Sequence, residues 1–254
     1  MALQAPGLPE ARLGPVVGAD GARSAVGGVV LLLPDGAPLS KRRPSPLPYA
    51  SLRPLARRLA RAGRDDGLAA HVVRYRFHGW NGTDAHLAED ANRCVDEAVR
   101  RYGDVPVCLA GRGMGGRAAL HAAGHPAVAS VLAIAPWLPE DDRAPAPEPV
   151  KQLVGRQVLI VHGTTDRRAD PELSLRLAER AKKINRTTCR FEVHSDGHAL
   201  RQHRAEVMAL ASDFVCGTLF SRRFSRPVVD ALAAPPPLGL RMPLAAGFGR
   251  SLER

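Results

Sequence analysis

The chain has 254 residues, the size of one large domain or two small ones. Hydrophobic residues make up 45% of it, which excludes a globally disordered chain. Lys and Arg number 36 and Asp and Glu number 25, so the formal net charge is +11. No apolar run approaches the ~20 residues of a membrane helix, and the opening MALQAPGLPE lacks the basic and apolar regions of a secretory signal. We therefore expect a soluble, cytoplasmic protein.

The spacing of cysteine and histidine predicts neither a disulfide scaffold nor a metal site. The four cysteines are widely separated and form no C-x-x-C pair. His194, His198 and His203 lie close in sequence, but no carboxylate or cysteine pattern typical of a metal site accompanies them. We expect no metal and no cofactor. The cysteines are Cys94, Cys108, Cys189 and Cys216.

The first half of the chain alternates predicted strands and helices. Residues 1–24 are rich in Gly, Pro and Ala, which predicts an irregular segment. Apolar residues at helical spacing predict a helix that begins at Ser51, and later helices over 87–102 and through Ala123. Apolar runs bounded by Gly and Pro predict buried strands at 27–33, 71–77 and 105–110.

The second half continues the alternation and then changes character. Predicted helices follow over 170–183 and 200–215, and predicted strands cover 128–135, 157–161 and 188–194. Six such alternations are typical of an open parallel sheet with helices on both faces, here within residues 25–217. Residues 218–254 are basic and rich in Pro and Gly, which predicts a disordered tail.

Positive charge gathers in two parts of the sequence. Residues 41–64 hold eight Lys and Arg and no acid, and the tail adds six Arg. Such charge attracts phosphates or an anionic surface. However, no aromatic residues alternate with these arginines, as they do on surfaces that stack nucleic-acid bases. We therefore interpret residues 41–64 as a solvated face and do not expect a nucleic-acid partner.

Ligands in open parallel sheets bind beyond the carboxyl ends of the strands, and three such positions form a known order. A glycine-rich strand-to-helix turn, Gly111-Arg112-Gly113-Met114-Gly115, comes first; Asp166 then ends HGTTD, and His198 lies in SDGHAL. This pattern resembles the α/β-hydrolase family, in particular small bacterial dienelactone-hydrolase and esterase types. The resemblance implies a triad in which Asp166 orients His198 and His198 is the base, on a scaffold for small esters, thioesters, lactones or amides.

The sequence departs from the family pattern at the nucleophile. Gly113 stands where G-x-S-x-G has its serine. Glycine adopts the strained turn freely but offers no oxygen for an acyl-enzyme. We therefore expect the chain to be inactive or impaired as a serine hydrolase, and Gly113→Ser to be the change that tests this. Slow hydrolysis through a water activated by His198 stays an alternative.

The resemblance also implies an oxyanion hole and a pocket around these residues. The backbone N–H of Met114 and one donor from Gly36 or Ala37 are the expected hole. Asp35 departs from the glycine- or histidine-rich loops common in the family. The connection after the fourth strand is too short for a full cap domain, so we expect a minimal cap or none, and small substrates. The predicted pocket residues are Asp35, Trp80, Arg112 and Trp137.

Two other functions stay open. A non-catalytic protein would use the same pocket for a ligand or a partner. Gly111, Gly113 and Gly116 also spell G-x-G-x-x-G after a strand, which is typical of dinucleotide binding, although no acid ends the next strand to hold a ribose. A small acyl compound is the expected partner, with no membrane, and the oligomeric state is left open.

Overall fold

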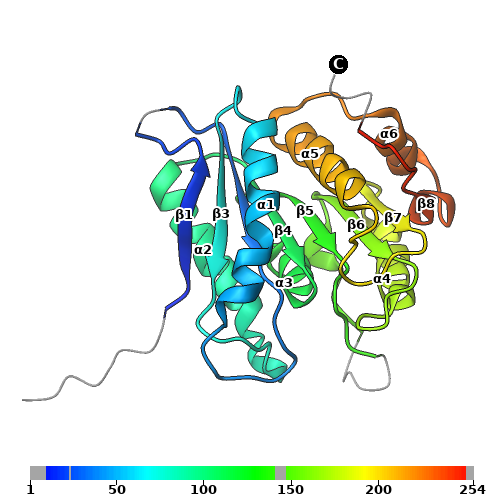
Figure 1. The fold of residues 1–254 in the computed structure, drawn as a ribbon, viewed down its shortest axis with the longest axis horizontal. Helices are drawn as coiled ribbons and strands as arrows, with labels where there is room; N and C mark the ends of the chain where they lie inside the picture. Colours follow the sequence, from blue (N-terminus) through cyan, green and yellow to red (C-terminus); the bar gives the residue numbers. More distant parts are fainter. Residues whose placement is uncertain (1–9, 23, 141–146, 250–254) are drawn as a thin grey trace, which may run out of the picture.

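The computed structural model describes residues 10–22, 24–140 and 147–249, and centres on one eight-stranded sheet (Figure 1). The strand order is β1-β3-β2-β4-β5-β6-β7-β8. Only β1 runs antiparallel to its neighbour, and every other pairing is parallel. The strands are β1 (Arg12–Gly18), β2 (Gly28–Leu33), β3 (Leu68–Arg74), β4 (Val107–Arg112), β5 (Val128–Ile134), β6 (Gln157–Gly163), β7 (Thr188–Val193) and β8 (Met242–Pro243).

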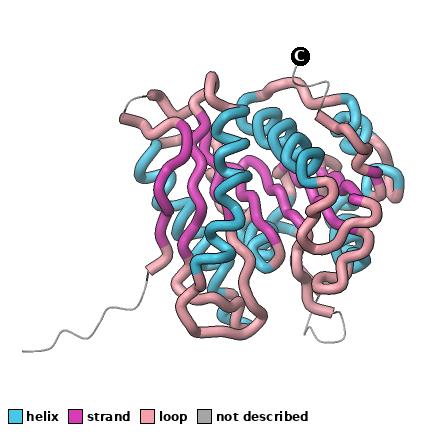
Figure 2. The backbone as a smooth tube through the Cα atoms, in the orientation of Figure 1, coloured by secondary structure: helices cyan, strands magenta, loops and turns pink. Residues whose placement is uncertain are grey.

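Helices cover both faces of this sheet (Figure 2). One apolar core joins the sheet to α2, α3 and α4, and a second joins it to α1, α5 and α6. The central strands are buried on both faces, which explains their continuous apolar runs. The helices are α1 (Pro46–Ala62), α2 (His86–Tyr102), α3 (Met114–Ala122), α4 (Pro171–Ile184), α5 (Arg204–Phe220) and α6 (Arg226–Ala233).

The carboxyl edge of the sheet carries no separate domain within the part of the chain that the structure describes. Between β5 and β6 the described residues add only a 3-10 turn, Lys151–Leu153. Among those same residues, none of the helices combines the length and the apolar character that crossing a bilayer requires. The open parallel sheet, covered on both faces and with a minimal cap, is as predicted.

The N-terminal segment differs from the prediction. An irregular 1–24 is wrong for residues 12–18, which form edge strand β1, while residues 1–9 lie outside the described residues. The strand was hidden because Gly14 and Pro15 interrupt its pattern, where the pairing with β3 is irregular. Its partner also lies more than 50 residues away in sequence, so local patterning carries little signal for it.

The C-terminal segment is also ordered where it is described, so the predicted disorder of 218–254 is wrong up to Gly249; residues 250–254 lie outside the described residues. Helix α6 packs against β7, and β8 extends the sheet. Buried basic side chains hold this segment. Lys182 Nζ donates to the carbonyl oxygens of Ala231 and Leu232, and Arg190 Nη1 donates to that of Leu240.

Several element boundaries also differ from the prediction, and helix α5, predicted over 200–215, spans Arg204–Phe220. Helix α1 begins at Pro46 and not at Ser51, because prolines are tolerated in a first helical turn, where their missing N–H has no partner to lose. Strand β3 begins at Leu68 and ends at Arg74, so the last residues predicted as strand, 75–77, have already left the sheet.

The docked C-terminal segment can be tested with two leucines. Leu240 is fully buried and Leu238 is 69% exposed. We expect Leu240→Ala to lower the free energy of unfolding by about 2–5 kcal/mol, as usual for a buried leucine. The matched control Leu238→Ala should change it by less than about 0.5 kcal/mol. Urea unfolding measures both values, and equal small effects would mean that the segment is not packed.

Candidate active site

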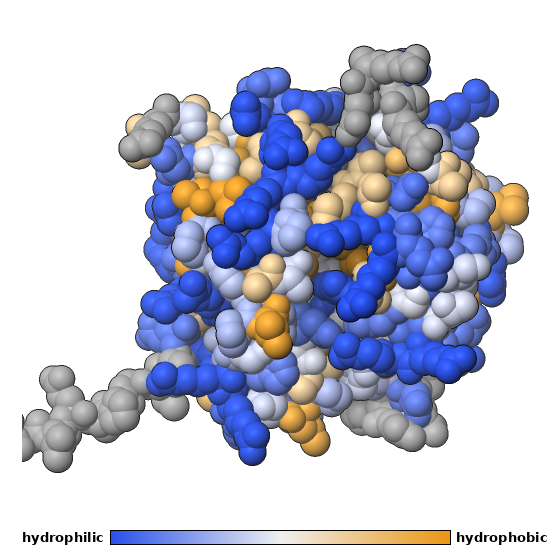
Figure 3. Space-filling model, in the orientation of Figure 1, coloured by the Kyte–Doolittle hydropathy of each residue, from blue (hydrophilic) through white to orange (hydrophobic). Residues whose placement is uncertain are grey.

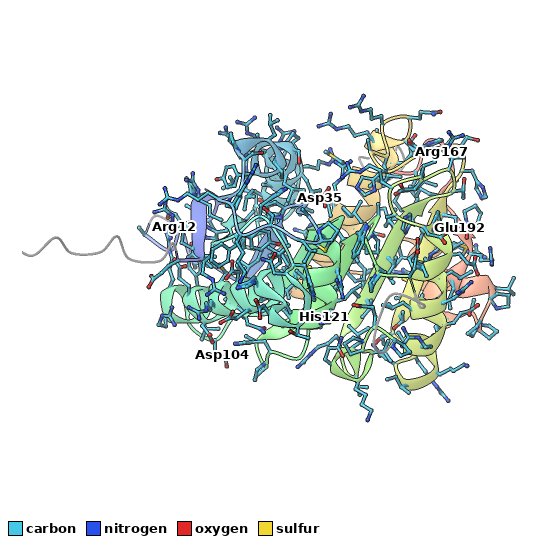
Figure 4. All side chains as sticks on the ribbon, turned by 90° about the horizontal axis from the view of Figure 1, so that it is seen from below. Arg12, Asp35, Asp104, His121, Arg167 and Glu192 are labelled. Atoms are coloured by element: carbon cyan, nitrogen blue, oxygen red, sulfur yellow. The ribbon has the colours of Figure 1, made fainter. Side chains whose placement is uncertain are left out.

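Loops after four parallel strands meet at the carboxyl edge of the sheet, which points downward in Figure 1 and faces the viewer in Figure 4. Asp35 follows β2, Gly113 follows β4, Asp166 follows β6 and His198 follows β7. Because β2 lies beside β4 in the sheet, the loop with Asp35 packs directly against the start of α3. Asp35 is labelled near the middle of this edge.

The turn between β4 and α3 requires glycine for two separate reasons. Gly113 has φ 56° and ψ −121°, a conformation that side chains with a Cβ rarely adopt. Gly111 and Gly115 allow close packing, because a Cβ at either would overlap backbone carbonyls. The Gly113 N–H donates to the Ile134 carbonyl (3.0 Å), which fixes the turn against β5.

Asp166 and His198 form a hydrogen-bonded pair. His198 Nδ1 lies 2.8 Å from Asp166 Oδ2, and Asp166 Oδ1 accepts the N–H groups of Arg168 and Ala169. Burial raises the pKa of Asp166, but hydrogen bonds from His162, from these two N–H groups and from His198 outweigh burial and hold the pKa far below its usual value. The carboxylate is therefore ionised and holds His198 with Nδ1 toward it.

His162 supports this pair, although it is not among the predicted site residues. Its Nε2 lies 3.3 Å from Asp166 Oδ2, and its Nδ1 lies 2.8 Å from Ser174 Oγ. Its side chain is fully buried. Only the spacing of four residues between His162 and Asp166 around the turn after β6 could have indicated the contact.

The Asp35 carboxylate lies against Gly113 and Met114, where the resemblance predicts the nucleophile and the oxyanion hole. Its Oδ1 accepts the N–H of Met114 (2.8 Å) and the N–H of Gly36 (2.9 Å). A Cβ added at Gly113 would overlap this carboxylate. Its Oδ2 faces His198 Nε2 at 3.7 Å, beyond hydrogen-bond distance. The same oxygen lies 3.5 Å from Nη2 of the exposed Arg168.

The surroundings of Asp35 favour its charged form. Burial raises its pKa, while the His198 imidazole and the N–H groups of Met114 and Gly36 lower it, and the net pKa lies below the usual value. An ionised carboxylate at the N-terminus of α3 also suits the positive end of the helix dipole. The two expected hole donors, Met114 and Gly36, are thus both engaged by a side chain of the chain itself.

Some predicted site residues have other roles. Ala37 as a hole donor is wrong, because its N–H donates to the His78 carbonyl (3.0 Å). Trp80 as a pocket wall is also wrong: it is buried in the core, beneath Arg117, whose Cζ lies 3.9 Å from the ring centroid. Trp137 is half-buried and lies on the far side of the same arginine.

Arg112 Nη2 donates to the His198 carbonyl, which ties the histidine loop to the turn.

The three glycines that suggested dinucleotide binding have packing partners. Gly111 packs on Gly115, and Gly116 packs on Pro136. The Met114 N–H at the start of α3, the position at which a pyrophosphate is usually bound, already donates to Asp35. A second anion at this helix start would be repelled by the first.

The charge of Asp35 can be tested by Asp35→Asn, which keeps the size and one acceptor oxygen. We expect the free energy of unfolding to fall by about 1.5–3 kcal/mol at neutral pH, the usual worth of a hydrogen bond to a charged group. Because the folded pKa is lowered, this contribution is present above the unfolded pKa of about 4 and is lost as the pH falls through the folded value. Urea unfolding should show that the difference in free energy of unfolding between the parent and Asp35→Asn is smaller at about pH 3 than at neutral pH.

A matched control is Asp65→Asn, at an exposed carboxylate away from the site. Its free energy of unfolding should stay within about 0.5 kcal/mol of the parent at both pH values. An Asp35→Asn effect that does not depend on pH would contradict the lowered pKa.

Comparison with solved structures places this geometry in a known fold. An esterase of Pyrococcus furiosus has 14% sequence identity and a TM-score of 0.61, over 76% of this chain and 84% of that chain. Est1E from Butyrivibrio proteoclasticus has 14% identity and a TM-score of 0.57, over 82% and 93%. An α/β serine hydrolase without a lid from Xanthomonas campestris has 20% identity and a TM-score of 0.52, over 79% and 86%.

Sequence comparisons add no closer assignment, because neither a protein-family model nor a curated protein matches the chain. At these identities the structural likeness concerns the arrangement of the backbone. The solved structures named above share this backbone arrangement with the chain. The sheet order and the glycine turn after β4 are consistent with the same fold. The chain has the α/β-hydrolase fold.

Proposed function

We propose that this chain is a disarmed member of the small-ester hydrolases, a protein whose scaffold suits esters, thioesters, lactones or amides but which binds a ligand without cleaving it. The observation that carries the proposal is the position of the Asp35 carboxylate between Met114, Gly36 and Gly113. Serine chemistry needs a hydroxyl at residue 113 and two free N–H donors for the oxyanion. Neither condition is met here.

The charge of Asp35 is a second obstacle to serine-type hydrolysis. A tetrahedral intermediate carries its negative charge on the oxygen that enters the hole. An ionised Asp35 puts a fixed negative charge at that point, so the developing oxyanion would be repelled and would lack its donors. The same argument weighs against direct attack by a water that His198 activates, because that reaction passes through the same oxyanion.

Binding without catalysis is the function that remains for the pocket. Asp166 still orients His198, whose Nε2 is buried and has no hydrogen-bond partner among the described residues. Because Nδ1–H of His198 is donated to Asp166, Nε2 of the neutral imidazole is a hydrogen-bond acceptor, so an acyl compound that offers an O–H or N–H donor would suit it. We consider dinucleotide binding the weaker alternative, since Asp35 already holds the N–H at the start of α3.

Restoring catalysis requires two changes together. Gly113→Ser alone places its Cβ against Asp35, so we expect it to stay unlabelled by a fluorophosphonate probe and inactive on short activated esters. Asp35→Ala with Gly113→Ser frees both donors and adds the nucleophile. We expect this double variant to exceed the parent in esterase activity by about 100-fold or more, a modest part of what a triad contributes.

Adding His198→Ala to the double variant is the matched control and should abolish labelling. The strained turn costs a serine about 1–3 kcal/mol, so urea unfolding must show that each variant is folded. Activity in the parent or in Gly113→Ser would show that Asp35 does not block the site. A folded but silent double variant would argue against the hydrolase scaffold, in favour of a pocket with another purpose.

A further inference from the structure

A cavity of about 1130 Å³ lies beside the candidate active site, and arginines dominate its wall. It is bounded by β1, the end of β3, the start of α1 and the outer face of α2, and its inner end reaches Pro34 and Asp35. Figure 4 labels Arg12 and Asp35, both of which line it. The lining arginines are Arg12, Arg43, Arg74, Arg76, Arg93 and Arg100.

Two of these arginines are neutralised by acids of α2. Arg76 pairs with the buried Asp90 and with Glu89, and Arg93 pairs with Glu89 at 2.8 Å. The other four, on β1, before α1, on β3 and on α2, are exposed and have no carboxylate partner within the described residues. They are Arg12, Arg43, Arg74 and Arg100.

The carboxylates of the wall do not offset these four charges by pairing. Asp35 is engaged in the oxyanion position, and Glu97 Oε2 accepts the Leu13 N–H at 3.0 Å. The third, Glu10, is exposed, and no ion pair of it occurs among the described residues. Against the two carboxylates of Glu10 and Glu97, these four arginines still leave an excess of positive charge on the wall, and Asp35 adds a negative charge where the cavity meets the candidate active site.

We propose that this cavity binds a small polyanion, a compound that carries two or more phosphate or carboxylate groups. Guanidinium groups suit both anions, because their N–H donors match two oxygens at once. The volume is that of a small-molecule site. Asp35 repels anions from the part of the cavity that it lines, so we expect the charged groups of the ligand at the arginines of β1, β3 and α2. The proposal stands whether or not the chain hydrolyses esters.

Arg74 differs from a freely solvated arginine, because its guanidinium packs over an aromatic ring. Arg12 and Arg74 are paired across β1 and β3, and the Arg74 guanidinium lies 4.9 Å from the centroid of the Tyr49 ring. In contrast, Arg53 and Arg57 lie exposed on α1 and outside the cavity. The face over α1 and α5 in Figure 3 is mixed, with hydrophilic side chains beside hydrophobic ones.

The test is titration calorimetry of the full chain at physiological salt with two probes, inorganic pyrophosphate and citrate. We expect at least one probe to bind, and the stronger of the two identifies phosphate or carboxylate as the natural group. Arg12→Gln with Arg100→Gln should weaken that binding by about tenfold or more, since hydrogen bonds between charged groups are the stronger kind. Arg53→Gln with Arg57→Gln removes the same charge outside the cavity and should change it less than about twofold.

Three results would overturn the proposal. One is that neither probe binds the parent chain. Another is that the control pair weakens binding as much as the cavity pair, which would show a diffuse charge effect. The third is that a short DNA duplex binds more tightly than either probe and competes with it, which would make the arginines part of an extended surface.

Discussion

The site depends on the Asp35 carboxylate, which accepts the Met114 N–H at the start of α3 and the Gly36 N–H of its own loop. Met114 and Gly36 donate to a single oxygen, so the loop after β2 is fixed to the turn after β4. The helix dipole and the two donors keep this carboxylate ionised, although burial opposes it. With that oxygen in place, the hole is filled and His198 faces a carboxylate where a serine would be expected.

Asp35 and Gly113 must be understood together. Any side chain at residue 113 would overlap the carboxylate, and the carboxylate fills the space that the missing side chain leaves. Glycine also relieves the strain of the turn, where φ is positive. The two residues thus form a reciprocal pair, and a change at either one alone leaves a steric conflict or two unsatisfied N–H groups. Each departure is visible in the sequence, but their contact is not.

Prediction succeeded where the signal was local or where strands are buried on both faces. The central strands and their helices follow from apolar runs, and the resemblance to the α/β hydrolases implied the contact between Asp166 and His198 that the structure contains. It failed where distant partners decide the outcome. Strand β1 forms through its pairing with β3, and the C-terminal segment docks because the buried Lys182 and Arg190 need carbonyl acceptors. Trp80 belongs to the core because Arg117 and His121 pack against its ring.

A formal charge of +11 is the sum of arginines and lysines with quite different roles. Lys182 and Arg190 are buried and donate hydrogen bonds to carbonyl oxygens, so their role is to stabilise the fold. Arg53 and Arg57 are solvated on α1. Arg43 lies in the same basic segment of the sequence as these two, yet it joins arginines of β1, β3 and α2 around one cavity. The place of each arginine in the folded chain therefore decides which arginines are able to bind one anion together. How closely the arginines follow one another in the sequence does not.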